Sequence, residues 1–185
     1  MCLLWGYVDS NKDDSQPRVF DLDALAIRCA MWVNSDPFDI GNTTENALLP
    51  LKNDPKYTLA FHAANEKNPS SKSNGSLMRC MPHAIFLADL AKAEKYKEMY
   101  DLISMEVNIT HGQKMVHEAI FVYIVALCHI LNNPDAPDRG KVAFEKAYAL
   151  AKSDFCTTID EKYGEKVEWW MDYAKGWVDA AIAAK

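Results

Sequence analysis

The sequence lacks the features that mark metal-binding, redox and membrane proteins. Its five cysteines are widely spaced and include no C-x-x-C pair, so neither a zinc knuckle nor a dithiol motif is predicted, and reduced thiols fit a cytosolic protein. The first seven residues are apolar but carry no basic leader, so we expect no signal peptide. The longest apolar stretch, Ala119 to Leu131, is shorter than the roughly 20 residues that a membrane-spanning helix needs. We therefore expect a buried core helix there, no membrane contact and a cytoplasmic location.

The sequence also lacks an excess of positive charge. It has 26 acidic and 20 basic residues, a net charge of −6 and a pI near 5.3. Binding to nucleic acid relies on neutralising phosphate charge, which this balance does not favour. We expect no nucleic-acid partner.

What is present is the composition of an ordinary globular domain. The chain has 185 residues, of which 49% are hydrophobic and 25% charged, so residues 1–185 are predicted to form a single domain around one core. No segment alternates apolar and polar residues as a half-buried strand requires. The predicted fold class is all-α, a compact domain of orthogonally packed helices.

Apolar spacing and capping residues predict where the helices lie. Asp21 or Asp23 is expected to cap a helix that ends near Asn34, and Asp54 with Pro55 is expected to begin another. A polar loop is expected over residues 68–75. The remaining predicted helices run from about 42 to 49, 76 to 90, 93 to 105, 113 to 131, 142 to 152 and 161 to 184.

Loops between helices are the places where backbone groups remain available for a ligand. The first notable loop runs from Asp36 to Thr44 and contains Asp39, Gly41 and Asn42 just before a helix. A turn followed by a helix cap, formed by Asn42 or Thr43, accounts for this composition without a ligand.

The second loop runs from Ser73 to Arg79 and contains the sequence Asn74-Gly75-Ser76. A small, flexible loop that leads into a helix offers free N–H groups and the positive end of a helix dipole, which suit a phosphate. Arg79 is expected to add charge or to brace an acidic loop. The loop matches neither a phosphate-binding GxxxxGK[ST] motif nor a GxGxxG turn, and an ordinary surface loop is the alternative.

Two further segments carry side chains with binding chemistry. Thr110-His111-Gly112 precedes the long apolar helix, and His111 there either caps the helix, hydrogen-bonds a ligand or stacks on a base, with capping favoured. Asp13 and Asp14 supply two adjacent carboxylates, which are suited to Mg²⁺, although acidic turns are also common on surfaces.

In this order, the segments DPFDIGNTT and NGSLMR and the Thr-His pair that opens a long apolar helix resemble the ADP-ribosylglycohydrolase family. The resemblance runs from about Phe20 to about Leu131. It implies an all-α fold, in agreement with the prediction from helical spacing. It also implies cleavage of the N- or O-glycosidic bond that joins ADP-ribose to a protein side chain or a small acceptor, usually with two Mg²⁺ ions.

The resemblance also implies roles for particular residues. The backbone of Asn74, Gly75 and Ser76 would cradle the pyrophosphate. Met78 and Arg79 would hold this loop, and His111 would lie near the nucleotide. The rim of the site would be shaped by three residues of the first loop, Asp39, Gly41 and Asn42, and the metal ligands would include two carboxylates, Asp13 and Asp14.

The sequence departs from the family pattern in its acidic motifs. Lys12-Asp13-Asp14-Ser15 matches the first metal-binding motif only in part, and no segment matches the second. One hypothesis is a working Mg²⁺-dependent hydrolase with replacement ligands from Asp36, Asp39 or Asp160. The favoured hypothesis is a member with reduced or lost catalysis that binds ADP-ribose.

Two alternatives remain. The chain could instead be a non-catalytic scaffold or a subunit of a larger assembly, or an unrelated helical domain. Exposed aromatic side chains near the C-terminus, Trp169, Trp170 and Trp177, would then contact a protein partner, although core packing accounts for them equally well.

Overall fold

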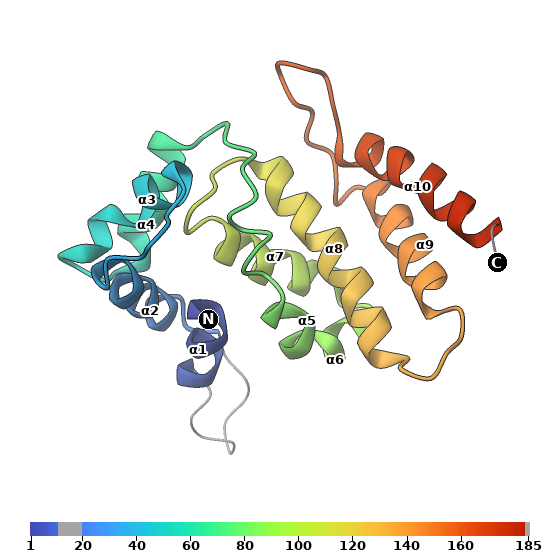
Figure 1. Ribbon diagram of the computed structural model, residues 1–185, viewed down its shortest axis with the longest axis horizontal. Helices are drawn as coiled ribbons and strands as arrows, with labels where there is room; N and C mark the ends of the chain where they lie inside the picture. The colour runs from blue at the N-terminus through green and yellow to red at the C-terminus, as the bar shows by residue number, and fades with distance from the viewer. Residues whose placement is uncertain (11–19, 184–185) are drawn as a thin grey trace.

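The computed structural model describes residues 1–10 and 20–183. Throughout these residues the regular structure is helical, which confirms the all-α prediction. The elements, shown in Figure 1, are α1 (Cys2–Ser10), α2 (Leu22–Asn34), α3 (Asn42–Leu48), η1 (Leu49–Lys52), α4 (Tyr57–Lys67), α5 (Pro82–Phe86), α6 (Ala88–Lys92), α7 (Tyr96–Val107), α8 (Lys114–Asn132), α9 (Arg139–Ala151) and α10 (Val167–Ala183).

Helix α2 begins as the sequence predicts. The carboxylate of Asp21 accepts hydrogen bonds from the main-chain amides of Asp23, at 2.8 Å, and Ala24, at 3.2 Å. These are two of the amides that a helix leaves unsatisfied in its first turn. The helix ends before Ser35, where the end was expected.

The predicted start of α4 at Asp54 and Pro55 is wrong. The helix begins at Tyr57, whose amide donates to the Asp23 carboxylate at 2.8 Å across 34 positions of sequence. A side chain of α2 therefore caps α4, and local sequence carries no signal for such a cap.

Other boundaries also differ from the predictions. Helix α1 was not predicted, and the residue at the N-cap position of α3 is Gly41 rather than Asn42 or Thr43. The segment from Ser76 forms turns before α5 and α6 instead of one helix. Helix α10 begins at Val167 because the preceding residues form a turn around Asp160.

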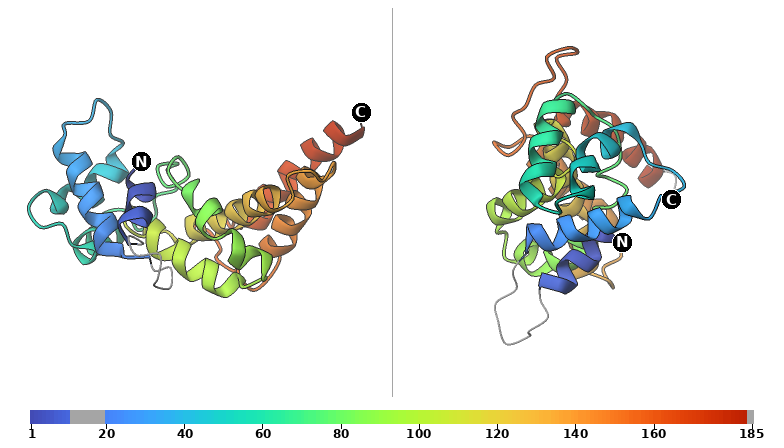
Figure 2. Two further views of the ribbon diagram at one scale, coloured as in Figure 1. Left: turned by 90° about the horizontal axis from the view of Figure 1, so that it is seen from below. Right: turned by 90° about the vertical axis from the view of Figure 1, so that its left-hand side faces the viewer.

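The molecule has two lobes, each with its own hydrophobic core, as Figures 1 and 2 show. The N-terminal lobe comprises α1 to α4 with η1, and the C-terminal lobe comprises α5 to α10. The prediction of one core is therefore wrong, because buried polar side chains lie where the lobes meet. The shape is elongated and curved, with the C-terminus far from the N-terminal lobe (Figure 2).

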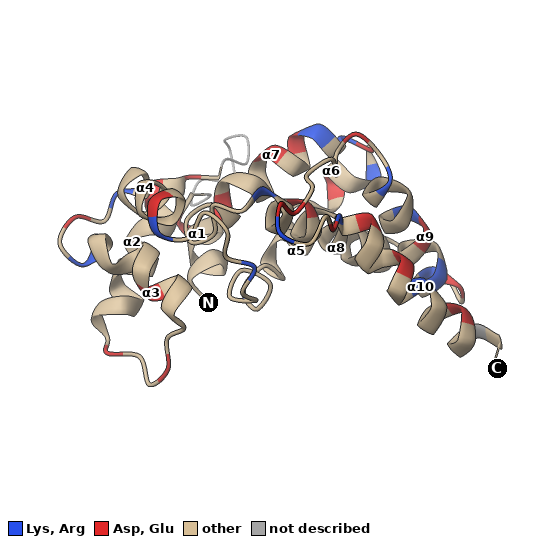
Figure 3. Cartoon of the chain, turned by 90° about the horizontal axis from the view of Figure 1, so that it is seen from above, with Lys and Arg blue, Asp and Glu red and all other residues tan. Residues whose placement is uncertain are grey.

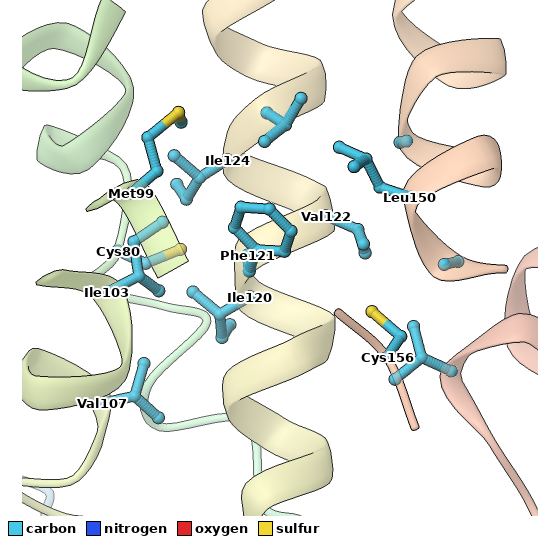
Figure 4. Close-up of a cluster of buried hydrophobic side chains, with 14 of the residues drawn as sticks. Cys80, Met99, Ile103, Val107, Ile120, Phe121, Val122, Ile124, Leu150 and Cys156 are labelled. Carbon is cyan, nitrogen blue, oxygen red and sulfur yellow. The ribbon is translucent and has the colours of Figure 1, made fainter. Parts of the chain in front are cut away.

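Helix α8 forms the centre of the C-terminal lobe. Its Phe121 is fully buried and lies between α7 on one side and α9 on the other (Figure 4). By length and composition alone α8 could cross a membrane, but more than half of its most apolar window is covered by the rest of the protein. This position is the one expected for a core helix.

Aromatic side chains join the two lobes. Tyr7 of α1 stacks on Phe86 of α5 with ring centroids 4.0 Å apart, and its hydroxyl is 2.6 Å from Nδ1 of His83. Burial, reinforced by the charge of Glu106, raises the pKa of Tyr7 far above its ordinary value. The neutral phenol is therefore a fixed part of the lobe junction.

Candidate functional site

The segment between α4 and α5 crosses the junction of the two lobes. Asn68, buried at the end of α4, anchors its start by donating from Nδ2 to the carbonyl oxygens of Thr43, at 2.7 Å, and Thr110, at 3.1 Å. The hydroxyls of Thr43 and Ser71 are 2.8 Å apart. One amide side chain thus ties together α3, the loop and the turn before α8.

The predicted phosphate loop, residues 74–79, forms tight turns rather than a helix end. The amide of Met78 donates to the carbonyl of Asn74, and the amide of Arg79 donates to that of Ser76. Within the described residues, the amides of positions 74 to 77 donate no hydrogen bond. Successive free amides in a turn form a concavity suited to anions.

Gly75 and Ser76 are closely packed against neighbouring parts of the protein. A Cβ atom on Gly75 would come within 2.9 Å of Oγ1 of Thr44 and 3.5 Å of Cε1 of His111, so a larger side chain displaces the loop or its neighbours. Ser76 is fully buried, and its hydroxyl has no partner among the described residues. The loop therefore has unused donor capacity on its backbone and on one side chain.

His111 does not cap α8, contrary to the favoured interpretation of the sequence. Gln113 occupies the cap position, and its side chain accepts from the amide of Met115. His111 is buried, with Nε2 2.9 Å from the hydroxyl of Ser73 and Nδ1 2.7 Å from that of Thr110. Burial, followed by the nearby charge of Arg79, lowers its pKa to about 4. The imidazole is therefore neutral near pH 7 and links Ser73, just before the loop, to Thr110, just before α8.

Arg79 braces the loop through a buried ion pair. Its Nε is 2.6 Å from Oε1 of Glu106, and its terminal nitrogens reach the carbonyl oxygens of Gly75, at 3.2 Å, and Glu106, at 3.4 Å. Burial acts to raise the pKa of Glu106, but the charge of Arg79, the His83 ring 3.5 Å away and the hydrogen bond from Arg79 lower it to about 2. The carboxylate stays ionised although it is fully buried.

Glu106 was not among the predicted residues, although the sequence contains a signal for it. Met99, Ile103 and Glu106 follow the three- and four-residue spacing of one helical face, and the first two are core residues. A carboxylate at a core position requires a buried cation. Arg79, the loop arginine nearest to Glu106 in the sequence, could therefore have been predicted as its partner.

A second ion pair links the loop to the segment before α10. Nζ of Lys72 is 2.8 Å from Oδ2 of Asp160, and Oδ1 of the same aspartate accepts from the amides of Lys162 and Tyr163. Asp160 is therefore already engaged in structural contacts. Binding a metal ion through Asp160 would therefore require that its contact with Lys72 be broken.

The described residues do not form a metal centre. Residues 1–10 and 20–183 contain no cluster of three or more His, Cys, Asp or Glu side chains placed to hold a metal ion. Asp36 and Asp39 are exposed on the loop before α3. Asp13 and Asp14, the predicted ligands, lie outside the described residues, and two adjacent carboxylates alone would not complete a site for two metal ions.

The structure brings some of the predicted residues together and separates others. Gly75, Ser76, Arg79 and His111 lie in or beside one loop, and Asn74 is exposed at its tip. The Met78 side chain is 75% exposed, and its contact within the loop is the main-chain hydrogen bond to Asn74.

The predicted rim residues Asp39, Gly41 and Asn42 are all exposed. The contacts to the loop come instead from the next two residues of α3. Thr43 bonds Ser71, and Thr44 lies against Gly75.

Charge is spread thinly around the loop. Figure 3 shows acidic and basic residues scattered over the described chain rather than gathered in one basic patch. Both cations beside the loop, Arg79 and Lys72, already have carboxylate partners. Anion binding at residues 74–77 would therefore depend mainly on main-chain amides.

Comparison with known proteins gives two findings. The sequence profile of a family described as ADP-ribosylglycohydrolase matches residues 1–184. The chain is also 27% identical over 148 residues to a protein of Acanthamoeba polyphaga mimivirus that is named as an ADP-ribosyl glycohydrolase, and the match covers 78% of this chain and 44% of the viral protein. The chain thus spans less than half the length of this relative. No solved structure matches it significantly.

Proposed function

Because this chain belongs to the ADP-ribosylglycohydrolase family, we propose that it binds ADP-ribose attached to a protein side chain or a small acceptor, with the diphosphate held by the loop of residues 74–77. The observation that carries the proposal is the set of four successive amides without a hydrogen-bond partner among the described residues. A diphosphate offers several acceptor oxygens, which such amides bind well.

The surroundings of the loop support this role. Arg79 and His111 fix it from two sides, and His111 does so as a neutral group. A loop held in one conformation before the ligand arrives loses little conformational entropy on binding. Since the flanking cations are already paired, we expect the affinity for ADP-ribose to depend weakly on salt.

The loop is tested by replacing Gly75 with valine and measuring ADP-ribose binding by calorimetry. The new side chain collides with Thr44 and moves the amides, so affinity should fall at least about tenfold, or about 1.4 kcal/mol. Gly140→Val is the matched control, since a Cβ there meets nothing within 4 Å. Thermal melting of both variants verifies that they fold.

Competition identifies the part of the ligand that is recognised. ADP should displace ADP-ribose from the wild-type protein, whereas adenosine should not. Unchanged affinity in Gly75→Val, or equal displacement by adenosine, would count against a diphosphate loop.

We further propose that catalysis is reduced or lost. The support is the partial match of Lys12-Asp13-Asp14-Ser15 to the first acidic motif and the absence of a carboxylate cluster among the described residues. The test is release of ADP-ribose from an ADP-ribosylated arginine or serine peptide, with and without Mg²⁺. Binding without release supports the proposal, and release that requires Mg²⁺ contradicts it.

The alternative is a non-catalytic scaffold or a subunit of a larger assembly that uses α10. One face of this helix carries Trp169, Tyr173 and Trp177 at four-residue spacing, and these side chains are 49%, 80% and 80% exposed. Large exposed aromatic patches mark interaction surfaces. If the partner is a second copy, sedimentation velocity should show association that is lost in the double variant Tyr173→Ser, Trp177→Ser. A wild-type monomer at high concentration would exclude self-association.

We also propose a cytoplasmic location. Its support is that all five cysteines are free thiols, which is usual in a reducing compartment. Fractionation of cells that express the tagged chain tests the location.

A further inference from the structure

Helices α1 and α2 approach each other unusually closely. A Cβ atom on Gly6 of α1 would lie 3.3 Å from both Cα and Cβ of Leu25 on α2, so only glycine allows this backbone separation without adjustment. The two helices run antiparallel, since Ser10 contacts Asp21 and Cys2 contacts Arg28. Cys2, one turn before Gly6 on α1, therefore lies near Cys29, one turn after Leu25 on α2. The short side chains of two cysteines can meet where backbones come this close.

The sulfur of Cys2 lies directly on α2. Its Sγ is 3.5 Å from the carbonyl oxygen of Arg28, the residue immediately before Cys29. The two thiols interact, since each shifts the pKa of the other in opposite directions. Cys29 is 4% exposed and belongs to the core of the N-terminal lobe, whereas Cys2 is partly accessible. One thiol of the pair is therefore open to a reagent, and the other is held behind it.

The local charges favour the thiolate of the accessible residue. The interaction with Cys29, together with the positive charge of Arg79, lowers the pKa of Cys2 to about 7 against the opposing effect of burial. The interaction with Cys2 and burial raise the pKa of Cys29 well above its ordinary value. Thiolate is the attacking form in disulfide exchange, so Cys2 reacts first.

We propose that Cys2 and Cys29 form a reversible disulfide that staples α1 to α2 when the protein meets a low-molecular-weight disulfide. The Cys2 thiolate attacks one sulfur of that disulfide, which forms a mixed disulfide and releases one thiolate. Cys29 then loses its proton and attacks the Cys2 sulfur, which releases the second thiolate. The small disulfide gains two electrons and becomes two thiols, and the protein loses two hydrogen atoms.

The staple would act on the parts of the chain that adjoin the lobe junction. It closes the chain between residues 2 and 29, which includes Asp13 and Asp14. It also fixes α1, whose Tyr7 contacts His83 beside the Arg79–Glu106 pair. The other three cysteines, Cys80, Cys128 and Cys156, are buried and lie in the C-terminal lobe. Burial raises the pKa of each of them to about 12, so they are not expected to compete.

The test treats the full chain with oxidised glutathione, blocks remaining thiols with N-ethylmaleimide and maps the products by peptide mass spectrometry. The wild-type protein should lose two hydrogen atoms and yield a Cys2–Cys29 peptide pair. Closing a loop of this size should raise the melting temperature by roughly 5–10 °C, an effect that dithiothreitol reverses.

Two variants distinguish the order of the steps. Cys29→Ser should accumulate glutathione on Cys2, because the resolving thiol is gone, whereas Cys2→Ser should stay unmodified. Cys156→Ser is the control and should behave as the wild type. A stable glutathione adduct on wild-type Cys2, a disulfide between other cysteines, or no reaction in the wild type would overturn the proposal. None of these outcomes bears on ADP-ribose binding, so this inference and the proposed function fail separately.

Discussion

The lobe junction and helix α10 reverse the ordinary distribution of side chains in opposite ways. The junction buries the ionised carboxylate of Glu106, the neutral imidazole of His111 and the Ser76 hydroxyl, which has no partner among the described residues, and it covers most of the Arg79 guanidinium. Helix α10 instead turns large aromatic side chains to solvent. Buried polar groups and exposed apolar patches are the two departures from the usual pattern that carry information about function.

The two regions differ in how their departures are compensated. At the junction the buried carboxylate of Glu106 is paired with Arg79. The hydrogen-bond donors without a partner among the described residues are the Ser76 hydroxyl and the amides of residues 74–77. On α10 nothing among the described residues covers the aromatic face. The ADP-ribose site proposed for the junction and the partner surface proposed as the alternative for α10 rest on this difference.

Removing the cation of the junction should have the largest effect. Arg79→Met leaves the buried Glu106 carboxylate without its arginine partner, so the free energy of unfolding should fall by about 3–5 kcal/mol. Lys97→Met, in the exposed pair Lys97–Asp101, should change it by less than about 0.5 kcal/mol. Urea denaturation measures both. Equal effects would show that the junction pair contributes no more than a surface pair.

Acid should weaken the junction before it affects α10. Unfolded His111 binds a proton with a pKa near 6.5 and the folded residue with a pKa of about 4. The unfolded state therefore holds more protons between these values, and stability falls by about 2–3 kcal/mol as pH drops from 6.5 to 4.

His117, whose pKa is lowered by burial, contributes in the same direction. His111→Asn should therefore make the pH profile shallower without flattening it. The measurement is urea denaturation at pH values from 4 to 7. A profile that His111→Asn leaves unaltered would contradict a buried, neutral imidazole.

Ser76→Ala should have a smaller effect, of opposite sign. It removes a buried hydroxyl that lacks a partner among the described residues, so the ligand-free protein should gain about 1 kcal/mol of stability. Loss of stability would mean that the hydroxyl is satisfied within the protein. Thermal and urea melts without ligand decide between the two.

Substitutions on the exposed face of α10 should have the smallest effect on the isolated chain. Trp177→Ser removes a side chain that is 80% exposed, so the free energy of unfolding should change by less than about 0.5 kcal/mol. Val167→Ser, at a buried position of the same helix, should destabilise the chain by about 2 kcal/mol. Similar losses for both would show that the aromatic face is packed in solution.

The sequence predicts where the helices lie more reliably than it predicts the residues at which they begin. Helix α8 was predicted within one residue because its long apolar run has no competing interpretation, and Asp21 was predicted as a cap because capping is local. The start of α4 was missed because its cap, Asp23, comes from another helix. Division into two cores was missed because composition alone does not reveal where polar side chains gather.

The site shows the same limit. Arg79, Gly75 and His111 were singled out by their loops, and the structure brings them together. Glu106 and Asn68 were missed, since each acts through partners more than 20 residues away. Met78 and Asp39 were chosen by position in a motif, and a motif does not say which way a side chain points.

Two asparagines of the α4–α5 loop, Asn68 at its start and Asn74 at its tip, should deamidate at different rates. Deamidation proceeds when the following main-chain nitrogen attacks the side-chain amide. Asn68 is followed by Pro69, which has no N–H, and it is buried with its amide engaged. Asn74 is exposed and followed by Gly75, whose nitrogen is free. During storage the anchor of the loop should therefore persist, while its tip slowly acquires a negative charge that repels phosphate.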